Sequence, residues 1–248
     1  MKIIAFFLAS LLLGPPVLAQ QQDISQLTAK EVVDKALAVF KQNEELVYDI
    51  TSYKERRVVE DFAVEDFLSN QESKPRSKEE TTSTGQKQSK IIVNGQEINV
   101  PKILSSLYQY RIPIDLENRV RDYNGIECFV VEFESKAGLR ILETKDNFTH
   151  RLRGQIFINT EDMNIVAVVA PIPNEFIFTT WKFIFPVRIK IRAFSLVFSQ
   201  KYELGLAFKN SVIAVAHYEV WGAAKGVKRF TFEYFDYKLR KDRLRKDL

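Results

Sequence analysis

The stretch RGQIFINTEDMNIVAVVA, residues 153–170, consists of two apolar runs around a polar centre. The flanking runs have the short length and the Ile, Phe and Val content that are typical of buried β-strands. Between them, Asp and Asn favour a turn because their side chains bond to nearby backbone groups. The stretch therefore predicts a β-hairpin.

Glu161 and Asp162 sit at the centre of this stretch and fit a turn better than an active site. General acid–base catalysis needs carboxyl groups that converge on one cleft, whereas adjacent residues at a turn tip point apart. The two histidines, His150 and His217, have no zinc-binding spacing, and the sequence lacks a Gly-x-Ser-x-Gly elbow and a phosphate-binding glycine loop. We expect no catalytic residue, no metal site and no cofactor.

Upstream of this hairpin, two Asn-Gly pairs predict further hairpins, because Asn-Gly favours the type I′ turn. One hairpin spans residues 119–133, and the other spans residues 90–100, where the second arm is either a strand or a loop. Between them, Ile103–Tyr110 predicts a short helix.

Downstream, residues 181–192 alternate between apolar odd positions and mostly basic even positions, which predicts one strand. Pro186 cannot donate to a ladder and places an edge or bulge in it. The alternation then changes phase near Ala193, which indicates a bulge. The last strand alternates again, with Phe230, Phe232 and Tyr234 on one face.

The region before these strands starts with a helix. The pattern Thr28-Ala-Lys-Glu31 is a capping box, and apolar residues then recur at helical spacing as far as Phe40. Residues 46–62 are rich in strand formers, whereas residues 71–89 are polar and predict a loop with at most one solvent-facing strand. One helix followed by many antiparallel strands predicts an α+β domain with one strongly twisted sheet.

The N-terminus predicts export. Lys2 precedes an apolar run that is too short for a comfortable membrane span, and small residues end it at Ala19. We expect a signal peptide over residues 1–19, cleaved after Ala19, and one domain over residues 20–248; an uncleaved anchor helix is the alternative. The single cysteine, Cys128, cannot form an internal disulfide and fits a buried, inert thiol.

The net charge of +4 is concentrated near the C-terminus. A basic tail in an exported protein favours an anionic membrane surface or an acidic partner, and the alternative is a solvated terminus. The basic residues of this tail that we expect to make such contacts are Lys238, Arg240, Lys241, Arg243 and Arg245. Nucleic acid is not expected as a partner, because the basic positions of residues 181–192 lie opposite the aromatic ones rather than among them.

The surplus of large apolar side chains is the most informative feature of the composition. The chain has 19 Phe, and one short helix covers only part of one face of a sheet. If the aromatic side chains of residues 181–198 and 230–232 face inward, they either line a cavity or fill the core. An apolar cavity of this kind suits acyl chains, whose binding depends on buried area.

The order of these elements resembles that of the LolA-like outer-membrane lipoprotein-sorting proteins, in particular an uncharacterised bacterial branch. The resemblance is carried by residues 151–166, with support from residues 123–133, 185–188 and 232–238. It implies an unclosed, strongly curved half-barrel whose concave face is covered by helices. It also implies a periplasmic carrier for lipidated proteins or lipids.

Two alternatives remain open: an RseB-like periplasmic sensor of lipoprotein or lipid state, and a secreted hydrolase of unrecognised type. On the carrier interpretation, the expected partners are lipoprotein acyl chains or lipid. The residues expected to line the cavity are Trp181, Phe183, Phe185, Val187, Ile189, Phe230, Phe232, Phe157, Phe129 and Phe40.

Overall fold

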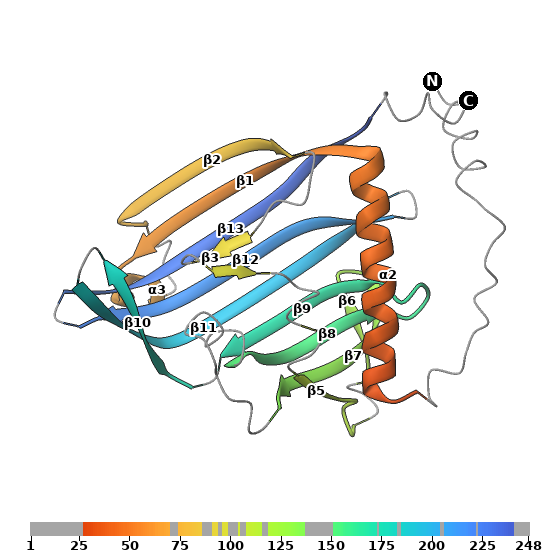
Figure 1. The fold of residues 1–248 in the computed structure, drawn as a ribbon, viewed down its shortest axis with the longest axis horizontal. Helices are drawn as coiled ribbons and strands as arrows, with labels where there is room; N and C mark the ends of the chain where they lie inside the picture. Colours follow the sequence, from red (N-terminus) through yellow and green to blue (C-terminus); the bar gives the residue numbers. More distant parts are fainter. Residues whose placement is uncertain are drawn as a thin grey trace.

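The fold is a large antiparallel sheet with one long helix packed on it (Figure 1), as seen in a computed structural model. The structure describes residues 27–69, 74–85, 91–93, 96–98, 104, 108–115, 119–136, 151–172, 174–182, 185–203, 206–221 and 223–240. The predicted signal peptide lies outside the described residues.

The helices are α2 (Ala29–Ile50) and α3 (Val64–Leu68). The strands are β1 (Thr51–Phe62), β2 (Ser77–Gly85), β3 (Ile91–Val93), β4 (Gln96–Ile98), β5 (Tyr108–Arg111), β6 (Val120–Tyr123), β7 (Ile126–Ser135), β8 (Arg153–Asn159), β9 (Ile165–Ile172), β10 (Phe176–Lys182), β11 (Phe185–Glu203), β12 (Leu206–Val220) and β13 (Ala224–Leu239).

The main sheet has 11 strands, and its path runs β2-β1-β13-β12-β11-β9-β8-β7-β5, with β10 paired to β11 and β6 paired to β7. All pairings are antiparallel, and within the described residues β2 and β5, at the two ends of the path, do not pair with each other. The predicted α+β class and unclosed sheet are confirmed.

Helix α2 begins where the sequence predicts. Thr28 is its N-cap, and the capping box with Glu31 forms in both directions. The helix ends at Ile50, and its C-cap is Thr51, whose hydroxyl donates to the carbonyl oxygen of Val47 at 2.6 Å. The helix therefore includes residues 46–50, which the sequence assigned to a strand, and it leads directly into β1.

The sheet has two apolar clusters, one on each face. On β8, Ile156 and Ile158 belong to the cluster that includes α2, whereas Phe157 between them belongs to the other. We call the side that carries α2 the helix face and the opposite side the far face. The far-face cluster is small and consists of Cys128, Val130, Phe157, Val166 and Ala167, with Tyr123, Ile126, Val169 and Tyr202 against it.

Local turn chemistry explains the confirmed hairpins. Asn124 and Gly125 both have positive φ, as the type I′ turn between β6 and β7 requires. Between β8 and β9, the carboxylate of Asp162 accepts from the backbone N–H and the side-chain amide of Asn164, both at 2.9 Å. Asp162 therefore holds a turn, as predicted. The β3–β4 hairpin also forms, with a strand as its second arm.

Two predictions about strands and helices are wrong. Residues 181–192 do not form one strand: β10 ends at Lys182, β11 begins at Phe185, and Lys182 pairs with Phe185 across a hairpin. Tyr108–Arg111 is strand β5, where the sequence predicted the end of a helix, because it pairs with β7. The predicted bulge near Ala193 is present as a register shift between β11 and β12.

Candidate functional site

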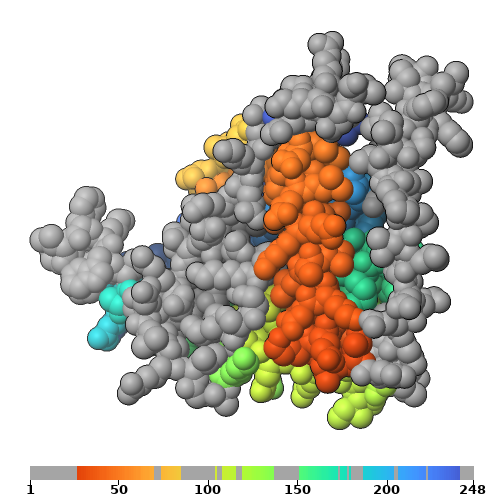
Figure 2. All heavy atoms as spheres, turned by 45° about the vertical axis from the view of Figure 1, so that its right-hand side comes forward, coloured from red at the N-terminus to blue at the C-terminus, as the bar shows by residue number. Residues whose placement is uncertain are grey.

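The first half of α2 packs on the helix face through apolar side chains. Val32, Val33, Ala36, Leu37 and Phe40 recur at helical spacing and are buried against the sheet. The ring of Phe40 meets Phe198 of β11 edge-on, with 5.9 Å between centroids. Figure 2 shows the opposite side of α2, in orange, forming a ridge on the surface of the molecule. Among the described residues, α2 thus covers this part of the helix face.

The second half of α2 adds polar contacts to the sheet. The side chain of Asn43 donates to the carbonyl oxygen of Ala207 at 2.5 Å and accepts from its N–H at 3.2 Å. Glu44 forms an ion pair with Lys209 at 2.8 Å, and both side chains are only 12% exposed. Lys209 also donates to the hydroxyl of Tyr48 at 2.7 Å. These contacts fix the end of α2 that leads into β1.

Aromatic rings surround the Glu44–Lys209 pair. The ammonium of Lys209 lies 5.4 Å from the ring centroid of Tyr48 and 5.9 Å from that of Tyr234. Burial raises the pKa of the Tyr48 hydroxyl far above its ordinary value, so this hydroxyl stays neutral. The positive charge of Lys209 is therefore compensated by one carboxylate and by ring faces.

The structure brings together only part of the predicted cavity lining. Phe40, Phe230 and Phe232 are buried in the helix-face cluster, and Phe129 and Ile189 pack against it. Phe157 is on the far face and does not join them. Val187 is half-buried, Phe183 lies outside the described residues, and so do the side chains of Trp181 and Phe185.

Arg57 is a helix-face residue that the sequence analysis did not select. It lies opposite Phe232 in the β1–β13 register, and its guanidinium is 5.5 Å from the centroid of that ring. Residues 54–57 contain three basic side chains, so composition alone does not distinguish Arg57 from its neighbours. Only the strand register, which includes a bulge between Ser52 and Lys54, assigns it to this face.

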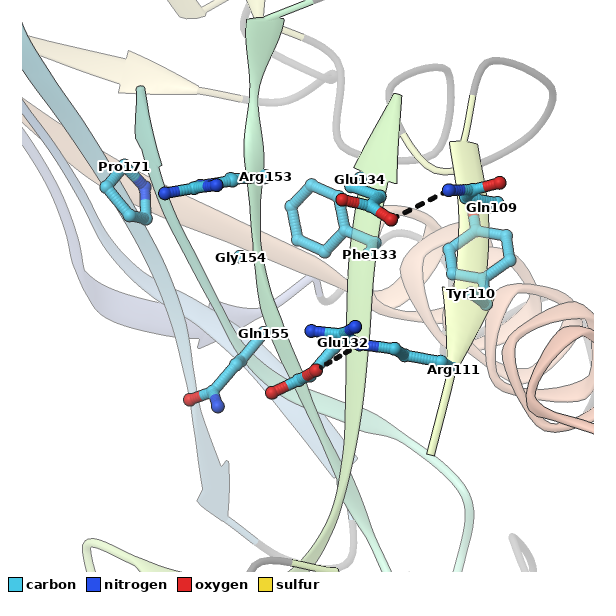
Figure 3. Close-up of a pocket in the computed structure, with 10 residues that line it drawn as sticks. All are labelled: Gln109, Tyr110, Arg111, Glu132, Phe133, Glu134, Arg153, Gly154, Gln155 and Pro171. Atoms are coloured by element: carbon cyan, nitrogen blue, oxygen red, sulfur yellow. Dashed lines mark hydrogen bonds and ion pairs between the residues drawn. The ribbon is translucent and has the colours of Figure 1, made fainter. Parts of the chain in front are cut away.

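A pocket of about 510 Å³ lies over β5, β7 and β8 (Figure 3). Its lining residues are Gln109, Tyr110, Arg111, Glu132, Phe133, Glu134, Arg153, Gly154, Gln155 and Pro171. Arg111 donates to Glu132 at 2.6 Å, and Gln109 donates to Glu134 at 2.7 Å. The pocket was not predicted from the sequence, because its polar residues come from three strands, β5, β7 and β8, that are not adjacent in the sequence.

The polar pairs in this pocket largely satisfy one another. The carboxylate of Glu132 raises the pKa of the Arg111 guanidinium, which therefore stays charged. Gly154 lines the pocket without a side chain. Only glycine fits there, since a Cβ atom would lie 1.9 Å from the carbonyl oxygen of Val169. The pocket can accept a polar group, but it lacks the continuous apolar lining that an acyl chain needs.

The structure also places Cys128 and part of the basic tail. Cys128 is fully buried on the far face, and burial raises the pKa of its thiol to about 12. In the basic tail, Lys238 lies in β13 and the backbone N–H of Arg240 donates to Ile50, whereas Lys241, Arg243 and Arg245 lie outside the described residues. No helix among the described residues has the length and apolar character needed to cross a membrane.

Comparison with known proteins assigns this chain to no family. No protein-family model and no curated protein matches the sequence. A solved structure, the crystal structure of MucB in complex with MucA(peri), aligns with 86% of this chain and 99% of its own, with 8% identity and a TM-score of 0.28. The resemblance to LolA-like proteins stays a prediction.

Proposed function

We propose that this protein is a periplasmic binding or carrier protein that holds the acyl chains of lipids or lipidated proteins against the helix face, without catalysis. The observation that carries the proposal is the asymmetry of α2. Its second half is fixed by Asn43 and Glu44, whereas its first half covers the apolar face through side chains such as Val33 and Leu37. Such a helix can act as a lid whose first half lifts from the sheet while the half held by Asn43 and Glu44 stays attached.

The energies of opening and of ligand binding are of the same order. Exposing four apolar side chains of the first half costs about 6–12 kcal/mol at about 1.5–3 kcal/mol each. Burying about 14 methylenes of an acyl chain returns about 11 kcal/mol at about 0.8 kcal/mol each. An acyl chain can therefore replace the contacts of the lid, whereas a short apolar molecule cannot.

Binding of a fluorescent fatty acid tests this proposal, together with native mass spectrometry of the purified protein. Two variants of β9 form a matched pair: Ala170→Leu fills space on the helix face, and Ala167→Leu does so on the far face. Both alanines are at most 1% exposed, so both variants meet the same kind of overpacking.

We expect the wild type to bind the probe and Ala170→Leu to bind it roughly tenfold more weakly, because the added side-chain carbons occupy space on the helix face that the acyl chain would take. Ala167→Leu should bind as the wild type does. A wild-type protein without probe affinity and without bound lipid would overturn the proposal. An equal loss of probe affinity in the two variants would show that the helix face is not the binding site. A sensor of lipid state would share this binding step.

A further inference from the structure

The Nε atom of Arg57 is buried and has no hydrogen-bond partner among the described residues. Leaving a buried donor unsatisfied is unfavourable, and more so where the group is charged. Within the same part of the chain, Arg57 also forms no ion pair. Such an orphaned donor needs a physical explanation.

Arg57 stands at the border between apolar and exposed surface on the helix face. Its partner in the β1–β13 register is the buried Phe232, and its partner in the β1–β2 register is the exposed Thr81. Its guanidinium rests over the Phe232 ring. Glu55 and Glu79 share this face by register, yet among the described residues neither pairs with Arg57.

Arg56, the preceding residue, shows what a paired arginine on this strand looks like. It points to the far face, where its Nε donates to Glu233 at 2.6 Å and its guanidinium lies 3.9 Å from Glu80. Because side chains alternate along β1, Arg56 has two carboxylate neighbours, whereas Arg57 lies beside the ring of Phe232.

We propose that Arg57 binds the acidic headgroup, a carboxylate or a phosphate, of the acyl ligand. This inference rests on the proposed function and narrows the ligand to anionic amphiphiles. A guanidinium matches the geometry of either headgroup with two parallel hydrogen bonds. From Arg57, the row of Phe232 and Phe230 continues along the same face and offers an apolar path for the chain.

Oleate and oleyl alcohol separate the headgroup from the chain. We expect the wild type to bind oleate roughly tenfold more tightly than the alcohol, as a charge-assisted hydrogen bond is worth about 1.5–3 kcal/mol. Arg57→Leu should lower the affinity for oleate to that for the alcohol. Arg56→Leu, the matched control, should keep the preference. Arg57→Lys, which keeps the charge but not the paired hydrogen bonds, should keep part of it.

The outcomes distinguish this inference from the proposed function. If neither oleate nor the alcohol binds, the proposed function fails. If both bind equally, or if Arg57→Leu keeps the preference, the headgroup role of Arg57 is wrong while lipid binding stands. If Arg57→Leu does not fold, Arg57→Lys decides, and an unchanged preference there overturns the role. Displacement of oleate by inorganic phosphate at equal concentration would show an anion site rather than a lipid headgroup site.

Discussion

The two faces of β7, β8 and β9 use the same strands but are covered in different ways. On the far face, Tyr123 of β6 and Tyr202 of β11 pack on a small cluster, so parts of the sheet itself cover it. On the helix face, a much larger cluster has α2 as one of its covers, and α2 is attached to the sheet by its second half and by the junction at Thr51.

The far-face cluster is covered by strands of the sheet, whereas part of the helix-face cluster is covered by a helix. Strands that belong to the ladder cannot leave without breaking backbone hydrogen bonds, whereas a helix satisfies its own backbone, so its unattached half can lift from the sheet without that loss. Binding that requires opening is therefore expected on the helix face and not on the far face.

The largest effect is expected from truncating one aromatic residue on each face. Phe40→Ala and Phe157→Ala should each lower the free energy of unfolding by about 3–5 kcal/mol, since both rings are buried and meet another ring. Urea unfolding measures this loss. Only Phe40→Ala should also accelerate association of the fatty-acid probe, because it loosens the lid. Equal acceleration in Phe157→Ala would erase the distinction between the faces.

The attachment of α2 is tested by its buried ion pair. Glu44→Gln should cost about 3–5 kcal/mol, because it leaves the charge of Lys209 buried without a counterion. The double variant Glu44→Gln/Lys209→Met should recover a large part of that loss in the same urea experiment. Strictly additive effects in the double-mutant cycle would show that the pair does not couple the helix to β12.

The smallest expected effect is on the pH dependence of stability, and it comes from Cys128, which is buried on the far face. The Cys128 thiol has its pKa raised by burial from its ordinary 9.0 to about 12. The unfolded chain therefore releases this proton at lower pH than the folded one, so stability falls as pH rises above 9. Between pH 9 and pH 10, the wild type should lose about 1 kcal/mol more than Cys128→Ser.

This difference can be measured by urea unfolding at the two pH values. Addition of oleate should leave the thiol equally unreactive toward a thiol reagent, because the ligand opens the other face. Rapid labelling of Cys128 in the presence of oleate would mean that the far face opens as well.

The sequence predicted the elements that local signals encode. The capping box at Thr28, the Asn-Gly turn at residues 124 and 125 and the polar turn at Asp162 each depend on a few neighbouring residues, and all three are present. The alternation of residues 181–192 was misleading because the apolar and polar positions continue to alternate through the hairpin between β10 and β11.

The candidate site was less predictable, because it depends on register and on contacts between distant residues. Phe157 is as apolar as Ile156, and only the pairing of β8 decides which of them faces α2. The partnership of Glu44 with Lys209 and the position of Arg57 beside Phe232 leave no local signal either. The sequence therefore indicated an apolar face without showing how it is covered.

Photo-crosslinking with a diazirine-bearing fatty acid, followed by peptide mapping, locates the bound acyl chain on one face of the sheet. We expect adducts on the first half of α2 and on helix-face residues such as Ile156 and Phe232, with fewer adducts in Ala170→Leu. Adducts confined to far-face residues such as Phe157, or to the polar pocket around Arg153, would contradict this expectation.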